Sequence, residues 1–374
     1  MSTLKVTNIE SPSGGGISAK ITDIGGSQLS NRNLIINGAM QVAQRATSVT
    51  GLGNNDSGYH TVDRFRFGEQ GTPTCAFTNT QSTDAPSGFS NSFRLDTTTA
   101  ESPIGAANLI YTDYRIEAQD LQRLGYGTAD AKSITLSFYV KSTVSGTYAV
   151  WFYNPDGAVA CTHTYTIAAG EVNTWQYRTI TVAGDTSNVI DNDNGTGLFI
   201  RFALCAGTDW TSGTASTTWA AASVTEANRF PGHTANVASS TSDDWSITGV
   251  QLEVGDLATS FEHRSYGDEL QRCQRYFQKT IFTNGFMGAT TKVYANFHPF
   301  VTMRAQPTID AEGPIEINAS GTNSTASSVD INNYGTSNAN RFIIISNFAT
   351  ITQYSPASMR FDANQNLLTA SAEL

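Results

Sequence analysis

The sequence predicts an all-β protein: a jelly-roll β-sandwich followed by a short helix and a smaller C-terminal β domain. The first observation behind this prediction is the alternation of apolar and less apolar residues, clearest in SITLSFYVKS, where Ile134, Leu136, Phe138 and Val140 share one face. The second is composition. Charged residues make up 14% of the chain, below the roughly 25% usual in globular proteins, so Ser, Thr, Asn and Gln must supply most of the polar surface.

The chain of 374 residues divides into four segments. Residues 1–30 are short, polar and rich in glycine, so they cannot build a core and are expected to form an N-terminal arm that orders on a partner. Residues 31–262 carry the jelly-roll strands, and residues 263–280 form a connecting helix. Residues 281–374 carry further strand-like runs between Asn/Gly/Ser-rich links and form a distal β domain.

Eight strands are expected in the sandwich, joined by long polar connections: Leu34–Met40, Val62–Phe67, Phe93–Asp96, Ile134–Lys141, Tyr148–Tyr153, Thr174–Val182, Leu198–Leu204 and Trp245–Val254. In TWQYRTITV, and again around Gly249, the alternating apolar residues change from one face of the strand to the other. A β-bulge would explain each slip, because one extra residue turns later side chains to the other face. The segment Tyr114–Gly127 is predicted to be a short helix or turn.

The N-cap residue, the distribution of charges and the apolar periodicity all predict the connecting helix. Ser265 is the expected N-cap residue, with acidic residues in the first turn and basic ones near the end. The apolar residues recur at four, three and four positions: Tyr266, Leu270, Cys273 and Phe277. Two interpretations stay open. The stripe either packs on the chain's own sandwich or forms a seam where three copies meet, although a self-sufficient coiled coil needs three or four heptads.

Composition also disfavours several classes of protein. The net charge is −10 and no Lys/Arg cluster is present, which argues against nucleic-acid binding. Four dispersed cysteines without a CxxC pair argue against zinc ribbons and redox motifs, and Cys205 is expected to be a core thiol. We find no signal-peptide pattern and no apolar run long enough to span a bilayer, so we expect synthesis in a cytoplasm and no membrane insertion.

Motifs for catalysis and for bound cofactors are not found. The chain has no GxSxG, HExxH, P-loop or GxGxxG pattern, and its five histidines are dispersed. The acidic stretch DNDNG, Asp191–Gly195, departs from the EF-hand pattern and is expected to be a polar turn. We therefore expect no enzymatic activity, no catalytic residue and no cofactor. Carboxylate pairs for glycoside hydrolysis cannot be judged from sequence, because their separation is spatial.

Aromatic residues are the better candidates for binding. Trp151 and Tyr153 share one strand face, and Trp210 and Trp219 lie in a long polar loop. Trp175 and Tyr177 form a further same-face pair. Flat rings beside hydroxyl and amide groups can stack on sugars, so Trp151, Tyr153, Trp210 and Trp219 are the predicted glycan-binding residues. The alternative for the strand aromatics is core packing.

Three stretches carry a family resemblance: NLIINGAMQVAQR, then YHTVDRFRF, and later SITGVQLEVGDLATSFEHRSYGDELQRCQRYFQK. They resemble a module of bacteriophage tail fibres and related virion appendages, which is similar to the galactose-binding-like jelly rolls of carbohydrate-binding domains. The resemblance implies a homotrimer located in the virion tail. Its arm would dock on other virion tail or adaptor proteins, and its C-terminal domain would point at the host. It also implies a structural calcium, with Asp63, Glu253 and Asp256 as the nearest acidic candidates.

The function expected from the sequence is therefore attachment of a phage tail fibre to a host-surface glycan, without catalysis. Tethered copies raise the effective concentration, so weak single sites suffice. Two alternatives stay open: a structural adaptor or decoration protein of the virion that binds no receptor, and a depolymerase that cuts the glycan it binds.

Overall fold

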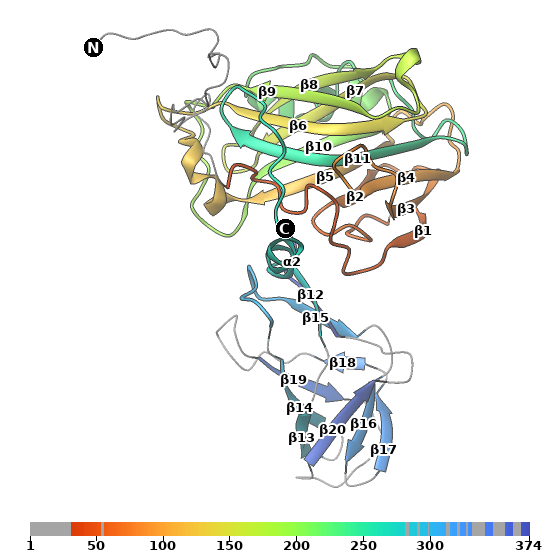
Figure 1. The fold of residues 1–374 in the computed structure, drawn as a ribbon, viewed down its shortest axis with the longest axis vertical. Coiled ribbons are helices and arrows are strands. Elements are labelled where there is room, and N and C mark those ends of the chain that lie inside the picture. Colours follow the sequence, from red (N-terminus) through yellow and green to blue (C-terminus); the bar gives the residue numbers. More distant parts are fainter. Residues whose placement is uncertain are drawn as a thin grey trace, which may run out of the picture.

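The computed structural model describes residues 31–53, 56–280, 284–289, 292–297, 299–311, 315–319, 322–326, 328–330, 341–346, 356–361 and 368–374 (Figure 1). The predicted N-terminal arm, residues 1–30, lies outside the described residues. Within the described part, no helix is long and apolar enough to cross a bilayer.

The body is a jelly-roll β-sandwich made of two antiparallel sheets (Figure 1). The first sheet has the order β1 (Ser48–Leu52), β3 (Ala76–Ser82), β4 (Ser92–Thr99), β11 (Asp244–Val254), β6 (Ile134–Ser142) and β9 (Gln176–Val182). The second has the order β2 (Arg66–Gln70), β5 (Leu109–Glu117), β10 (Thr196–Ala206), β7 (Gly146–Asn154) and β8 (Val159–Ile167). Short helices lie in the connections: η1 (Ala118–Leu124), η2 (Ala169–Glu171), α1 (Thr208–Thr211), η3 (Ala221–Val224) and η4 (Glu226–Asn228).

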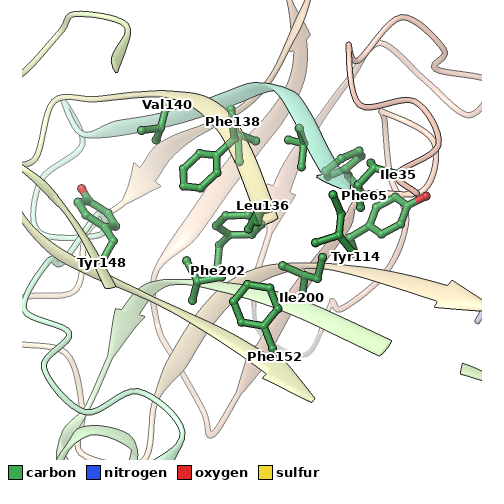
Figure 2. Close-up of a cluster of buried hydrophobic side chains, with 14 of the residues drawn as sticks. Ile35, Phe65, Tyr114, Leu136, Phe138, Val140, Tyr148, Phe152, Ile200 and Phe202 are labelled. Carbon is green, nitrogen blue, oxygen red and sulfur yellow. The ribbon is translucent and has the colours of Figure 1, made fainter. Parts of the chain in front are cut away.

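The core lies between the two sheets, where the inward residues of the alternating strands meet (Figure 2). Phe138 of β6 makes an edge contact with Phe202 of β10, with ring centroids 5.3 Å apart. Trp245 of β11 is fully buried and lies 6.2 Å from the same Phe202 ring. Each such side chain contributes roughly 1.5–3 kcal/mol on burial. The predicted core thiol, Cys205, is buried in this cluster.

Most of the predicted strands are present, and the exceptions have physical causes. Val62–Phe67 only overlaps the start of β2, and Leu34–Met40 is not a strand. Asn37 and Met40 have φ angles of +62° and +57°, and the buried Asn37 side chain bonds the backbone of Val42 and Asp63, so this segment is a tight turn. Four strands of the sandwich were not predicted. One of them is β3, whose sequence AFTNTQS is mostly polar.

Of the two predicted bulges, one is confirmed and one is wrong. The pairing of β11 with β6 shifts register between Thr248 and Gln251, where Gly249 has a φ of +62°. In contrast, β9 pairs with β6 without a shift. The apolar phase slips there because Tyr177 points outward and is 44% exposed. The segment Tyr114–Gly127 combines the end of β5 with the short helix η1.

The connecting helix, α2, spans Tyr266–Gln274. The Ser265 side chain accepts a hydrogen bond from the Asp268 backbone N–H, as the predicted cap requires. The predicted seam residues do not share one exposed face, because Cys273 and Phe277 are buried while Tyr266 is 57% exposed and Leu270 is half-buried. Phe277 lies beyond the helix, in β12 (Phe277–Thr280), and the Arg45 guanidinium stacks 3.6 Å over its ring. Cys273 and Phe277 thus pack on the chain's own body.

Beyond α2, a small sheet forms a neck towards the C-terminal β unit (Figure 1). We call this the neck sheet; its order is β12, β21 (Leu368–Ser371) and β15 (Thr308–Ala311). The C-terminal unit is a further sheet with the order β17 (Thr322–Ala326), β16 (Ile315–Ala319), β20 (Pro356–Phe361), β13 (Asn284–Ala289), β14 (Lys292–Phe297), β19 (Arg341–Ser346) and β18 (Ser328–Asp330). The predicted smaller β unit after the helix is therefore present.

The last residues of the chain return to the body. The Glu373 carboxylate accepts hydrogen bonds from Arg64 and, at 3.2 Å, from Arg45. Arg64 is fully buried, and its guanidinium lies 3.5 Å from the centre of the Tyr276 ring. Arg304 donates to the Glu373 carbonyl oxygen at 3.0 Å. A buried guanidinium needs such a partner, because an unpaired buried charge is strongly destabilising.

Candidate functional site

A depression of about 470 Å³ lies on the outer face of the first sheet, on the opposite side of β6 from the core. We call it the ring pocket. It combines aromatic rings with hydroxyl groups and backbone, and it is lined by Ser87, Gly88, Phe89, Ser137, Tyr139, Tyr177, Gly249, Ala258, Thr259, Ser260, Phe261 and His263. Its volume falls in the range of roughly 300–1,000 Å³ that is usual for small-molecule sites.

Two tyrosines form the floor of the ring pocket. Tyr139 on β6 and Tyr177 on β9 are register partners, so their side chains leave the sheet on the same face. The ring centroids lie 5.0 Å apart. Tyr139 is half-buried, while Tyr177 is 44% exposed and presents the most open ring of the pocket. The pleat of two neighbouring strands thus builds an aromatic surface that a ligand can reach.

One wall of the pocket is the loop of residues 83–91, which joins β3 to β4; we call it the Phe89 wall. A turn places Phe89 over the sheet, since its N–H bonds the Pro86 carbonyl oxygen at 3.1 Å and Gly88 adopts a φ of +94°. The Phe89 ring then lies 5.5 Å from Tyr139 and 5.0 Å from Phe261, measured between centroids. Phe89 therefore joins the floor of the pocket to its other wall.

Gly249 makes this close approach of rings sterically possible. A Cβ atom at this position would lie 2.7 Å from the Phe89 ring, which forces that ring to move, and 3.0 Å from the Tyr139 ring, which is a tight contact. The left-handed backbone at the β11 bulge also favours glycine. The predicted bulge is thus a structural part of the pocket.

The other wall is the segment that follows β11. The buried Glu253 carboxylate accepts hydrogen bonds from the Thr259 backbone N–H at 2.8 Å and from its hydroxyl at 2.7 Å. Gln251 accepts a bond from the Glu262 backbone N–H at 2.8 Å. These contacts fold the segment back on the sheet, so that Phe261 and His263 meet edge to face, 4.9 Å apart.

One cation contacts the lining of the pocket: the Arg32 guanidinium donates to the Thr259 hydroxyl and, at 3.0 Å, to the Ser260 carbonyl oxygen. None of the lining residues is Asp, Glu, Lys or Arg, and His263 is the one lining side chain that can become a cation. Behind the Phe89 wall, the Asp84 carboxylate accepts hydrogen bonds from Lys141 at 2.6 Å and from the Trp175 indole at 3.2 Å. The hydrogen bond from Lys141 is the main cause that lowers the pKa of Asp84 below its usual value.

Rings and hydroxyls in this arrangement suit a sugar. The faces of Tyr177 and its neighbours can cover the C–H side of a pyranose ring, while Ser87 and Ser260 offer hydroxyl groups at the margin. The pocket offers no carboxylate pair for acid–base chemistry among its lining residues.

The residues predicted from sequence to bind glycan lie elsewhere. Trp210 is 4% exposed, and its indole donates to the Ala107 carbonyl oxygen at 2.9 Å. Trp151 is also buried and stacks on the half-buried Tyr153 at 4.8 Å. Trp219 is half-buried, and its indole N–H donates to the Ala183 carbonyl oxygen at 2.8 Å. The two buried indoles therefore have no free face for a ligand, and packing explains them.

Sequence reasoning singled out only one ring of the pocket, Tyr177, and missed four: Phe89, Tyr139, Phe261 and His263. A usable signal was present for Tyr139, which occupies an outward position of the most regular alternating strand. An aromatic residue on the polar side of such a strand marks an apolar surface outside the core. No comparable pattern marks the two loop segments.

The predicted calcium ligands do not converge. Asp63 is buried and both its oxygens accept from Gln44, and burial raises the pKa of its carboxyl. The Glu253 carboxylate is hydrogen-bonded to Thr259, whereas Asp256 is exposed. Among the described residues, no group of three or more His, Cys, Asp or Glu side chains is arranged to hold a metal ion. The acidic stretch Asp191–Gly195 is a polar loop, as predicted.

The comparisons with known proteins find remote structural similarity. No protein-family model and no curated protein sequence matches. A tailspike domain of bacteriophage CBA120, described as enzymatically active, is 14% identical over 59% of this chain and 21% of that chain, with a TM-score of 0.30. A family 11 carbohydrate-binding module of Clostridium thermocellum is 12% identical over 57% of this chain and 96% of its own, with a TM-score of 0.27. At these TM-scores, the likeness carries no weight for the ligand or activity of this chain.

Proposed function

We propose that this protein binds carbohydrate and that the ring pocket is its sugar site. The observation that carries the proposal is the convergence of five rings on one open depression, with Tyr177 44% exposed at its floor. Exposed aromatic clusters are uncommon on a surface without a binding role. Stacking on aromatic faces, with hydroxyls at the margin, is the physical mode of recognition.

The ligand proposed for this pocket is a neutral sugar. A carboxylate, sulfate or phosphate group would lose its hydration on entering. No Lys or Arg lines the pocket, and the Arg32 guanidinium beside it already donates to Thr259 and Ser260. Neutral hydroxyls lose less on transfer and find hydroxyl partners on Ser87 and Ser260. Affinity for such a ligand depends little on salt, because no ion pair is formed.

The biological role proposed is attachment of a phage tail to its host, by a non-enzymatic homotrimer of the virion. Support comes from the resemblance of NLIINGAMQVAQR and its companion stretches to tail-fibre modules. Weak sites for neutral sugars suit this role, since avidity in a multivalent particle can exceed single-site affinity by about 10²–10⁴. Binding without cleavage is supported by the lining, which brings no carboxylate pair to the sugar.

The test compares two exposed tyrosines. Wild type, Tyr177→Ala and Tyr266→Ala are titrated calorimetrically with galactan, mannan and dextran oligosaccharides. Tyr266 is the matched control because it is 57% exposed on α2 and is not a lining residue of the pocket. We expect one of the glycans to bind wild type and Tyr266→Ala equally, and Tyr177→Ala roughly tenfold more weakly. Equal binding by all three variants, or no binding of any neutral glycan, would contradict the proposal.

A further inference from the structure

Two kinds of contact hold the Phe89 wall to the sheet: the packing of the Phe89 ring on Tyr139 and Phe261, and a set of hydrogen bonds. Four of its residues are exposed, namely Thr83, Ser87, Gly88 and Ser90, and Phe89 is the one large apolar side chain that it carries. Apart from Phe89, the loop gains little from burial, so the position of its backbone depends on individual hydrogen bonds.

Asp84 supplies the most extensive of these contacts. Its two carboxylate oxygens accept from different elements: one from Lys141 on β6, the other from Trp175, which directly precedes β9. Its carbonyl oxygen accepts from the Ser92 hydroxyl at 2.6 Å, and its N–H donates to Ser82 at 3.1 Å. The residue is thereby fixed in position from both strands and from its own loop.

The two partners of Asp84 are placed next to the floor of the pocket. Lys141 lies two residues beyond Tyr139 on β6, and Trp175 lies two residues before Tyr177. Residues two apart on a strand point to the same face. The carboxylate therefore ties the wall to the same two segments, on the same side of the sheet, that carry the floor.

The far end of the loop has its own anchor. The Thr248 hydroxyl, beside the β11 bulge, donates to the Asn91 carbonyl oxygen at 2.7 Å. Loss of the Asp84 contacts would therefore release the Pro86–Phe89 turn while residue 91 stays in place. The fold itself is little affected, since the Asp84 side chain is 38% exposed and a surface pair contributes about 0–1 kcal/mol to stability.

We propose that Asp84 is the positioning residue of the ring pocket: its bonds to Lys141 and Trp175 set the distance between the Phe89 wall and the tyrosine floor, and so the affinity for sugar. The inference rests on the proposed function for its effect on binding, but its structural part can be measured without any ligand.

The test uses the full chain with two variants and a control. Asp84→Asn removes the charge and weakens both bonds, and Lys141→Met removes the stronger donor. Glu171→Gln is the control, because Glu171 pairs with Arg178 at 2.7 Å beside the same sheet, with a comparable exposure of 33%. Hydrogen exchange over residues 83–91 and the indole N–H resonance of Trp175 report on the wall. Calorimetry with the neutral oligosaccharide that binds wild type reports on the site.

In Asp84→Asn and Lys141→Met, we expect faster exchange over residues 83–91, a shifted Trp175 resonance and affinity about 5–10 times weaker, whereas Glu171→Gln matches wild type. Wild-type affinity in both variants overturns the inference, and so does unchanged exchange over the loop. If wild type binds no neutral glycan, the proposed function fails. Hydrogen exchange then decides separately whether Asp84 holds the wall.

Discussion

Replacing Gly249 by alanine tests the contact on which the ring pocket depends. The added Cβ would lie 2.7 Å from the Phe89 ring. Because ordinary contacts begin near 3.4 Å, the ring must move by about 0.7 Å (3.4 − 2.7). The φ of +62° adds backbone strain of about 1–2 kcal/mol, and overpacking adds about 1–3 kcal/mol.

Gly51→Ala separates the two costs. Gly51, in β1 of the same sheet, has a φ of +79° but nothing within 4 Å of its added Cβ, so it carries the backbone strain without the clash. We expect Gly249→Ala to lower the free energy of unfolding by about 1–3 kcal/mol more than Gly51→Ala does. Its glycan affinity should fall by a factor of about 2–10, as expected when an aromatic contact is lost.

Urea unfolding measures the stability of both variants, and calorimetric titration measures binding. Gly51→Ala should bind as wild type does, because β1 lies at the far edge of the sheet from β9. The reasoning is refuted if Gly249→Ala is no less stable than Gly51→Ala and binds glycan with unchanged affinity. The Phe89 ring would then accommodate the methyl group without altering the pocket.

Three further predictions concern the rest of the described chain. Glu373→Gln leaves the buried Arg64 without its charged partner, so the free energy of unfolding measured in urea should fall by up to about 3–5 kcal/mol. Proteolysis at the neck should also be faster. Trp210→Ala should lower the free energy of unfolding by about 3–5 kcal/mol, because it leaves a cavity. Trp210→Phe keeps most of the side-chain volume, and it should retain glycan binding in the calorimetric titration. Burial lowers the pKa of His233 to about 4, so the unfolded chain takes up the proton first, and stability should fall by up to about 3 kcal/mol as pH drops from about 6.5 to 4. His233→Gln should flatten that part of the pH profile, measured by thermal unfolding.

The sandwich was predictable where each strand carries its own pattern. SITLSFYVKS alternates because one side faces the core, and the bulge at Gly249 follows from the phase slip around it. Prediction failed where a distant partner decides the backbone. Leu34–Met40 is apolar enough for a strand, but Asn37 turns the chain by bonding Val42 and Asp63, which no local pattern shows.

The site was harder to predict than the fold because its rings come from four separate segments of the chain. Phe89, Tyr139, Tyr177 and Phe261 meet only once β6 and β9 pair and two loops fold over them. Trp210 and Trp219 were preferred in the sequence because they lie in a long polar loop, and Trp151 because it shares a strand face with Tyr153. Their large rings favour burial, and Trp151 and Trp210 fill the space under loops on the second sheet.

The neck sheet determines how tension would pass between the body and the C-terminal β unit. Its three strands are antiparallel, and at one end of the sheet Phe277 and Thr308 both pair with Ser371, while at the other end Thr280 and Ala311 both pair with Leu368. A pull along the strands strains all the hydrogen bonds between them at once, because those bonds lie across the strand direction. Because β12 leads from the body to the C-terminal unit and β21 leads back, these bonds keep the outgoing and the returning strand in register.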